Sequence, residues 1–268
     1  MRELVARLLG VDPSVATLAI AAVLARVGAA VWIAPFLGGR LVPNTVKIAL
    51  TLVLALVLYP EVVRTVPAGA AAPLALAIVA KEVFVGLALG FVGAVVFWAA
   101  EAAGRMADTA RGANMAEVMV PQSGVRTSPL GDLFFQLALV LFIVLGGHRI
   151  FVSALGASYI SLPVGYFPSA SGLGGFALFC GRVTADLFLI GLSLAAPVIA
   201  AIFLTDLTLG LVNRFTPQVN VFFLAMPAKA AIGIGVLVLA AGLLLGALPP
   251  LLDRATLVVS RALDLLAG

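Results

Sequence analysis

Long apolar runs, separated only by short polar breaks, set the strongest constraint on how this chain can fold. The runs cover about residues 15–37, 44–59, 73–100, 130–146, 183–204 and 229–248. A helix that crosses the hydrocarbon core of a membrane needs about 20 apolar residues, although some of these runs are shorter than that. Because lipid cannot hydrogen-bond to the backbone, such runs predict helices that satisfy their own peptide groups.

The composition leads to the same class of protein. Of 268 residues, 63% are hydrophobic and only 10% are charged, whereas a typical soluble domain has about 25% charged residues. The net charge of +4 is scattered along the chain, and no cluster of Lys and Arg indicates nucleic-acid binding. We therefore expect an all-α integral membrane protein that forms a single membrane-embedded domain over residues 1–268.

The first apolar run predicts a retained membrane helix rather than a signal peptide. Arg2 and Arg7 precede it, as in a signal peptide, but the run reaches Leu37 and carries Arg26 in its middle. A signal peptide has an apolar region of only about 7–15 residues.

The distribution of basic residues gives no orientation in the membrane. A six-span arrangement with the N-terminus inside places seven Lys or Arg on each side, so the positive-inside rule gives no answer. This balance, together with the shorter runs, favours a non-standard topology.

One polar segment interrupts the apolar second half of the chain, in the stretch LTLGLVNRFTPQVNVFFLAMPAKAAIG at 207–233. Polar groups at membrane depth are costly, and they persist where they line an aqueous path or meet a partner. Two prolines break the helix there, which frees backbone groups that need a protein or water partner. The polar residues and prolines are Arg214, Pro217, Gln218, Asn220, Pro227 and Lys229.

A second polar segment, from Glu101 to Asn114, follows the third apolar run. Its charged residues Glu101, Arg105, Asp108 and Arg111 are four, three and three positions apart, so they share one face of a helix. Two interpretations are open: a salt-bridged stripe in water, or a charged face that lines a channel or contacts another subunit.

Lys81 and Glu82 lie near the start of the run 73–100. A charge within a membrane helix is unfavourable, and Pro73 is only eight residues away, so we favour side chains that extend to the interface. The alternative is a buried polar contact. Gly86 and Gly90 have the GxxxG spacing that allows close helix packing, although this is a weak signal in a chain with 27 glycines.

Signatures of an enzyme or a metal site are missing from the sequence. It contains no HExxH, GxSxG or GxxxxGK[ST] motif. The single Cys180 cannot form an internal disulfide, and the single His148 argues against a histidine-rich metal site. A pair such as Asp186 and Asp206 matches no protease motif, so we predict no catalytic, cofactor-binding or metal-binding residues.

Three motifs in order resemble the FliR/SctT family of type III export-apparatus proteins, over nearly the whole chain. The first segment has Arg26, Ala34-Pro35, Val42-Pro43 and Lys47, and the turn GGHR lies at 146–149. The third motif, NRxxPQxNxF followed by PxxK, is the most specific. It matches at Asn213, Arg214, Pro217, Gln218, Asn220, Phe222, Pro227 and Lys229.

The resemblance implies a non-enzymatic subunit of the type III protein export gate, in the bacterial inner membrane. Such a subunit would have long, partly broken helical hairpins. It assembles with membrane proteins of the FliP/SctR and FliQ/SctS types, and with a switch protein of the FlhB/SctU type. Unfolded proteins would cross through the conduit that these subunits form, and lipid would surround the rest. The segment ADTARGANMAEV at 107–118 favours the injectisome branch, SctT, and the flagellar branch, FliR, is the alternative.

The resemblance also suggests roles for the site residues. Arg214, Gln218 and Asn220 would hold a hairpin tip near the pore, and Pro217 and Pro227 would set the break in the helix. Subunit contacts would come from the charged stripe and from the start of the third run. These candidates are Glu101, Arg105, Asp108, Arg111, Lys81 and Glu82.

Two other interpretations remain at this point. The motif residues could be purely structural and touch nothing that moves. A small-molecule secondary transporter would also place a broken helix at the midplane, but the first half of the chain has no matching break.

Overall fold

The computed structural model describes residues 12–39, 42–112, 128–218 and 223–236, and the separate positions 220, 221, 238, 261, 262 and 265. All regular structure in these residues is helical, as the apolar runs predict. The chain divides into two compact units, one built from residues 1–94, 146–183 and 253–268 and the other from 95–145 and 184–252. We call them the first and the second unit. A single domain over 1–268 stays a prediction.

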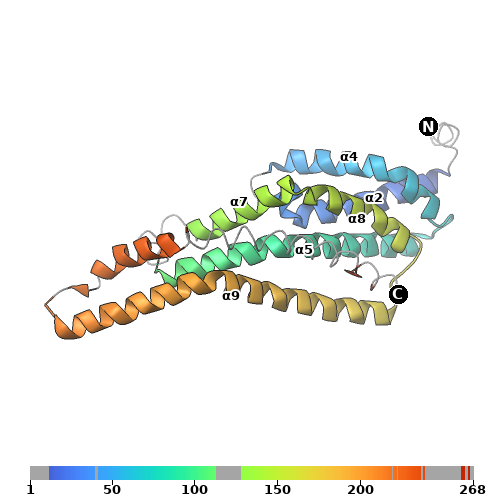
Figure 1. Cartoon of the computed structure of the whole chain (residues 1–268). Helices are drawn as coiled ribbons and strands as arrows, with labels where there is room; N and C mark the ends of the chain where they lie inside the picture. The colour runs from blue at the N-terminus through green and yellow to red at the C-terminus, as the bar shows by residue number, and fades with distance from the viewer. Residues whose placement is uncertain are drawn as a thin grey trace. The chain divides into compact units, whose positions relative to one another are not determined.

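The first unit is built around α2 (Pro13–Ile33), which packs along α4 (Asn44–Val62) (Figure 1). Between them lies the short helix α3 (Pro35–Gly38), and the 3-10 turn η1 (Val63–Thr65) follows α4. Proline occupies the first position of α2 and of α3, where its missing N–H leaves no hydrogen bond unmade. The unit also contains the first part of α5 (Ala72–Ala110), α8 (Gly147–Ser161) and the start of α9 (Ala170–Phe215).

Small residues bring α2 and α5 close together in the first unit. A Cβ atom added at Gly86 would lie 2.2 Å from the carbonyl oxygen of Arg26, and one at Gly90 would lie 3.0 Å from that of Ala30. The GxxxG spacing at these two glycines is therefore a true packing motif, because larger side chains would push the two backbones apart.

The second unit contains the rest of α5, α7 (Pro129–Val144), the larger part of α9 and a helix at Phe223–Val236. Gly104 allows α5 to approach the start of α7, since an added Cβ would lie 2.3 Å from the Leu130 carbonyl oxygen. The ring of Phe97 packs on that of Phe142 with centroids 5.2 Å apart, which joins α5 to the end of α7.

The described residues contain four helices that are long and apolar enough to cross a membrane, namely α2, α4 extended by η1, α5 and α9. The pair α7 and α8 adds a fifth span if it is one helix bent at Gly146, which has a positive φ of 78°. The sequence predicted about six apolar segments. The difference arises at the sixth run, where the Phe223–Val236 helix is shorter than a span and residues 239–248 lie outside the described part.

Two segments that the apolar runs leave out are also helical. Residues 147–175 contain the 15-residue helix α8 and the first residues of α9. The described part of the Glu101–Asn114 segment continues α5 without a break as far as Ala110.

Candidate functional site

The polar segment of the third motif forms the turn of a helical hairpin in the second unit (Figure 1). α9 ends at Phe215, and the chain turns through Thr216, Pro217 and Gln218 before the Phe223–Val236 helix. Pro217 lies in the turn itself, where a residue without a backbone N–H is tolerated. The predicted break after Arg214 is therefore present in the structure as the tip of this hairpin.

An ion pair joins the two arms of the hairpin. Lys229 Nζ lies 2.5 Å from Asp206 Oδ1, and the two side chains are 20% and 48% exposed. Asp206 belongs to α9 and Lys229 to the returning helix, so the pair fixes which residues of the two arms face each other. The sequence identified Lys229 through its motif but gave no reason to pair it with Asp206.

The tip of the hairpin presents polar groups outward. Asn213, Arg214, Gln218 and Asn220 are exposed, and Arg214 makes no ion pair or hydrogen bond with another described residue. Phe222 lies outside the described residues. The tip thus holds donors and acceptors that are open to a partner.

Apolar side chains on both arms surround this polar tip. Phe215 and Phe223, on either side of the turn, are 79% and 75% exposed. Further down α9, Phe203 and Leu204 are 62% and 65% exposed. Large apolar side chains that stay this exposed on both arms indicate contact with another protein or with lipid.

A buried charge network forms the polar centre of the first unit. Arg26 of α2 and Glu82 of α5 are both completely buried. Arg26 Nε donates to Glu82 Oε2 at 2.5 Å, and Nη2 donates to Glu82 Oε1 at 3.0 Å. This fork-to-fork arrangement is the strongest geometry that an arginine and a carboxylate adopt. It ties α2 to α5 at the place where the glycines bring their backbones together.

The same arginine reaches α8 and the residues after it. Nη1 donates to Ser158 Oγ at 2.9 Å, and Nη2 donates to the carbonyl of Leu162 at 2.9 Å. The guanidinium carbon lies 4.0 Å from the centre of the Tyr159 ring, a cation–π distance. Arg26 therefore connects three helices through a single side chain.

Lys81, which directly precedes Glu82 on α5, completes the network. Its ammonium lies 2.5 Å from Glu82 Oε1 and donates to the carbonyls of Pro163, Val164 and Tyr166 at 3.1–3.2 Å. Together with the Leu162 carbonyl, these oxygens follow the C-terminal end of α8, where the helix dipole favours positive charge. One carboxylate and four carbonyls thus balance two cations.

The favoured interpretation of Lys81 and Glu82 was wrong in one respect. The side chains do not extend to an interface, because Glu82 is fully buried and Lys81 is 7% exposed. The sequence could not identify their partner, since Arg26 lies 56 residues from Glu82. Their contacts in this structure are all within the chain, and a contact with another subunit stays a prediction.

The charged stripe of α5 has two parts with different surroundings, both in the second unit. Arg105 Nη2 donates to Glu101 Oε1 at 2.6 Å, and the Arg105 side chain is 48% exposed. Asp108 is fully buried and pairs with Arg111 at 2.6 Å. The two pairs on the predicted helix face therefore differ: the Glu101–Arg105 pair is partly exposed, whereas the Asp108–Arg111 pair is largely enclosed.

Asp108, in the enclosed part of the stripe, binds the start of α7. Asp108 Oδ2 accepts hydrogen bonds from Ser128 Oγ at 2.6 Å and from the backbone N–H of Leu130 at 3.0 Å. Ser128 in turn accepts from the N–H of Gly131 as the N-cap residue of α7. A carboxylate at a helix N-terminus satisfies free N–H groups and faces the positive end of the dipole. Asp108 thus has a clear structural role.

The described residues hold no group of three His, Cys, Asp or Glu side chains placed to bind a metal ion. The His148 Nδ1 atom is buried, and within the described residues it has no hydrogen-bond partner.

Comparison with known proteins agrees with the resemblance seen in the motifs. Residues 17–255 match the model of the family described as bacterial export proteins, family 1. The chain is 38% identical to Yop proteins translocation protein T of Yersinia pestis over 197 residues, and this aligned segment covers 73% of each chain. It is 32% identical to the flagellar biosynthetic protein FliR of Escherichia coli K12 over 215 residues, and this aligned segment covers 80% of each chain.

A third relative extends the comparison. The secretion system apparatus protein SsaT of Salmonella typhimurium is 37% identical over 158 residues, which cover 58% of this chain and 59% of SsaT. With helices able to cross a membrane at least four times, the chain is a multi-pass protein of the bacterial inner membrane. It belongs to family 1 of the bacterial export proteins.

Proposed function

We propose that this chain is a core, non-enzymatic subunit of a type III export gate and forms part of the wall of the conduit for unfolded proteins. The observation that carries the proposal is the hairpin of the second unit. Its tip presents Arg214, Gln218 and Asn220 outward, and apolar side chains flank that tip. In lipid the open polar groups would be costly, and in water the apolar arms would be costly. The hairpin therefore fits contact with other protein subunits, as expected at a gate.

The proposed partners are other membrane proteins of an export apparatus. One relative, SsaT, is named a secretion system apparatus protein, and two others are named a Yop proteins translocation protein and a flagellar biosynthetic protein. The finer proposal is contact with subunits of the FliP/SctR, FliQ/SctS and FlhB/SctU types. At the tip, the guanidinium of Arg214 would donate to backbone carbonyls of a neighbour, since it has five N–H donors and no acceptor.

We propose the injectisome branch rather than the flagellar one. Identity is 38% to the Yersinia translocation protein and 32% to the Escherichia coli flagellar protein, which supports this choice. The flagellar branch is the alternative.

Secretion by Arg214 variants tests the role of the tip. We expect Arg214→Ala to abolish export into the culture medium while the protein still accumulates in the membrane, because the tip loses its cation. Arg214→Lys should restore part of the export. The matched control is Arg182→Ala, which removes an exposed arginine from the first-unit part of the same helix and should leave export unchanged. Wild-type export by Arg214→Ala would refute the role of the tip.

Affinity purification in mild detergent tests the assembly itself. The tagged chain, expressed from its native locus, should bring along two further small hydrophobic proteins in one large complex. Needle or hook proteins in the same preparation would decide the branch. Recovery of a monomer or a homodimer alone would contradict the gate proposal.

A further inference from the structure

The hairpin of the second unit meets the end of α5 at Gly233, a buried glycine of the Phe223–Val236 helix. A Cβ atom added to Gly233 would lie 3.4 Å from Cδ and 3.7 Å from Cβ of Arg111, the residue that follows α5. It would also lie 3.7 Å from Cδ1 of Ile202 in α9. At these distances the helix that contains Gly233 packs against both α9 and the Arg111 side chain.

Two features fix the Arg111 side chain in this place. Its Nε donates to Asp108 Oδ1 at 2.8 Å, and its Nη2 lies 2.6 Å from the same oxygen. Gly112 has a positive φ of 78° and ends the helix directly after Arg111, as glycine commonly does. With its guanidinium bound and only 11% of the side chain exposed, Arg111 presents its aliphatic stem to Gly233.

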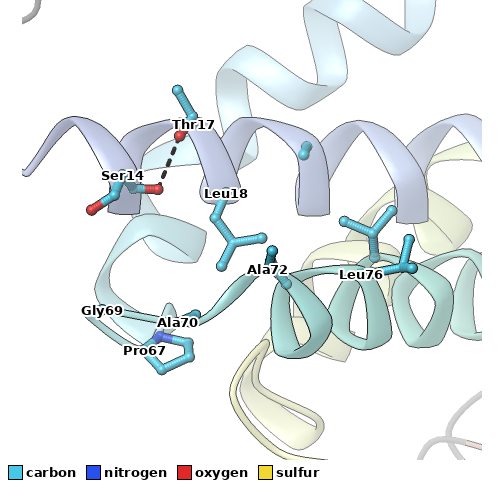
Figure 2. Close-up of a pocket in the computed structure, with 11 residues that line it drawn as sticks. Ser14, Thr17, Leu18, Pro67, Gly69, Ala70, Ala72 and Leu76 are labelled. Carbon is cyan, nitrogen blue, oxygen red and sulfur yellow. Dashed lines mark hydrogen bonds between the residues drawn. The ribbon is translucent and has the colours of Figure 1, made fainter.

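Small residues alone do not fix the position of a helix in this chain. Between the starts of α2 and α5, in the first unit, alanine and glycine leave an open groove beside Leu18 and Leu76 (Figure 2). At Gly233 the Arg111 stem contacts the place that a Cβ would occupy. The contact at Gly233 therefore supports the hairpin, because a side chain with a fixed position lies against the glycine.

This contact is in register with the ion pair between the two arms of the hairpin. Ile202 and Asp206 are four residues apart on α9, and Gly233 and Lys229 are four residues apart on the returning helix. Residues four apart are neighbours on one face of a helix, so both contacts belong to the same interface between the arms. Arg111 joins this interface one turn further from the tip than the ion pair.

The hairpin continues well beyond its contact with Arg111. From Ile202 to Phe215, where α9 ends, the helix rises about 20 Å. A tilt of about 10° at the contact would therefore move the tip by about 3 Å. A shift of that size breaks a hydrogen bond, since a nitrogen donor and its acceptor need to lie about 2.7–3.2 Å apart. The place of the tip thus depends on how the hairpin is held at Gly233.

We infer that Arg111 is a positioning residue, which holds the hairpin against the end of α5 through Gly233 and so sets the place of the tip. Asp108 fixes Arg111 and also binds the start of α7, so one carboxylate connects α7 to the hairpin. The use of the tip rests on the proposed function, whereas the contact itself is a property of this chain alone. Arg111 then acts within the chain, although the sequence suggested a contact with another subunit.

Distances between two spin labels in the purified full chain test this inference. Cysteines in place of the exposed Val140 on α7 and Phe215 at the tip carry the labels, and Cys180 is replaced by alanine. We expect Gly233→Leu to shift the mean distance by about 3 Å, because the larger side chain overlaps the Arg111 stem and tilts the hairpin. Arg111→Ala should broaden the distance distribution, because the hairpin loses its support.

Gly235→Leu is the matched control, since Gly235 lies on the same helix and a Cβ added there meets open space. It should leave the distance unchanged, and so should Gly233→Ala, whose methyl group makes ordinary contacts. Unchanged distances in both Gly233→Leu and Arg111→Ala would overturn the inference.

A disulfide gives a second test if these variants do not fold. The 3.7 Å between the Arg111 Cβ and a Cβ added at Gly233 lies in the range that a disulfide needs. In the chain without Cys180, Arg111→Cys with Gly233→Cys should therefore form an internal disulfide on oxidation, detected by mass spectrometry of the linked peptides. Arg111→Cys with Gly235→Cys should not, and equal yields of the two disulfides would overturn the inference.

Export of the same variants separates this inference from the proposed function. Where both hold, Gly233→Leu lowers export while the protein still accumulates in the membrane, and Gly235→Leu exports normally. A displaced tip with wild-type export would support the positioning role of Arg111 and contradict the proposed role of the tip.

Discussion

Replacing Glu82 with glutamine gives the sharpest test of the buried network. The substitution keeps the shape of the side chain but removes the one negative charge that contacts Arg26 and Lys81 within the described residues. Both cations then stay buried in the first unit without a counter-charge, at 0% and 7% exposure. The carbonyls of Leu162, Pro163, Val164 and Tyr166 still accept their hydrogen bonds, so the cations keep part of their solvation.

The expected loss follows from the burial of the pair. Removing one partner from a buried ion pair costs about 3–5 kcal/mol, because the other charge is left uncompensated. Because the four carbonyls still solvate the two cations, we expect Glu82→Gln to lower the free energy of unfolding by about 3 kcal/mol, the lower end of this range. For a chain of this size, such a change lowers the midpoint of thermal unfolding by roughly 10 °C.

The single cysteine provides the assay. Cys180 is the one cysteine of the sequence, and it packs partly buried against the core of the first unit. A fluorogenic thiol reagent added during a temperature ramp in mild detergent therefore reports the unfolding of the unit that contains the network.

Glu101→Gln is the control, since it makes the same change on the same helix in a pair whose arginine is half exposed. Exposed pairs contribute about 0–1 kcal/mol, so the midpoint should hardly move. Equal midpoint shifts in the two variants would refute the reasoning that burial sets the cost.

Two further substitutions test helix packing and capping, both read as unfolding midpoints by circular dichroism. Gly86→Ala should destabilise by about 1–3 kcal/mol, because its Cβ would overlap the backbone of α2; Gly174→Ala, with open space around it, should be neutral or slightly stabilising. Asp108→Asn should cost about 1–2 kcal/mol, since it removes the charge that faces Arg111 and the start of α7. The control Asp132→Asn, an exposed change in the first turn of α7, should cost less than 1 kcal/mol. Equal losses of stability in Gly86→Ala and Gly174→Ala, or in Asp108→Asn and Asp132→Asn, would contradict these assignments of packing and capping roles.

The sequence predicted the fold class because each apolar run is a local property. The runs at 15–37, 44–59 and 73–100 correspond to α2 with α3, α4 and the larger part of α5. α8 lies outside the apolar runs because it begins with Gly147, His148 and Arg149, residues that are typical of a connection. Its interior is apolar, and Phe151, Leu155 and Tyr159 are buried in the core of the first unit, so tertiary packing decides its helical state.

The candidate site was predictable only where a motif is continuous in the sequence. The residues from Asn213 to Lys229 follow one another, and the structure places their described members on one hairpin. The Arg26–Glu82 pair depends on the crossing of α2 and α5, which a single sequence does not reveal. The Lys81 contacts span 82–85 residues and are equally hidden.

The hydrogen bonds also narrow the candidates for contact with other subunits. Lys81 has three N–H donors, and Glu82 together with three carbonyls surrounds them. Both oxygens of Glu82 accept from Arg26, and the burial of Lys81 and Glu82 keeps their side chains away from a neighbour.

The carboxylate of Asp108 is likewise occupied by contacts within the chain. One of its oxygens pairs with Arg111, and the other accepts from Ser128 and from the N–H of Leu130. Glu101 and Arg105 form a single ion pair whose arginine is 48% exposed and whose glutamate is 15% exposed. Such a partly exposed pair is easily exchanged for a partner because it contributes little stability. We therefore expect a subunit contact on α5 to use Glu101 and Arg105. Charge reversal at Arg105, rescued by reversal of a partner's acidic residue, would establish that contact, whereas normal assembly of the single variant would exclude it.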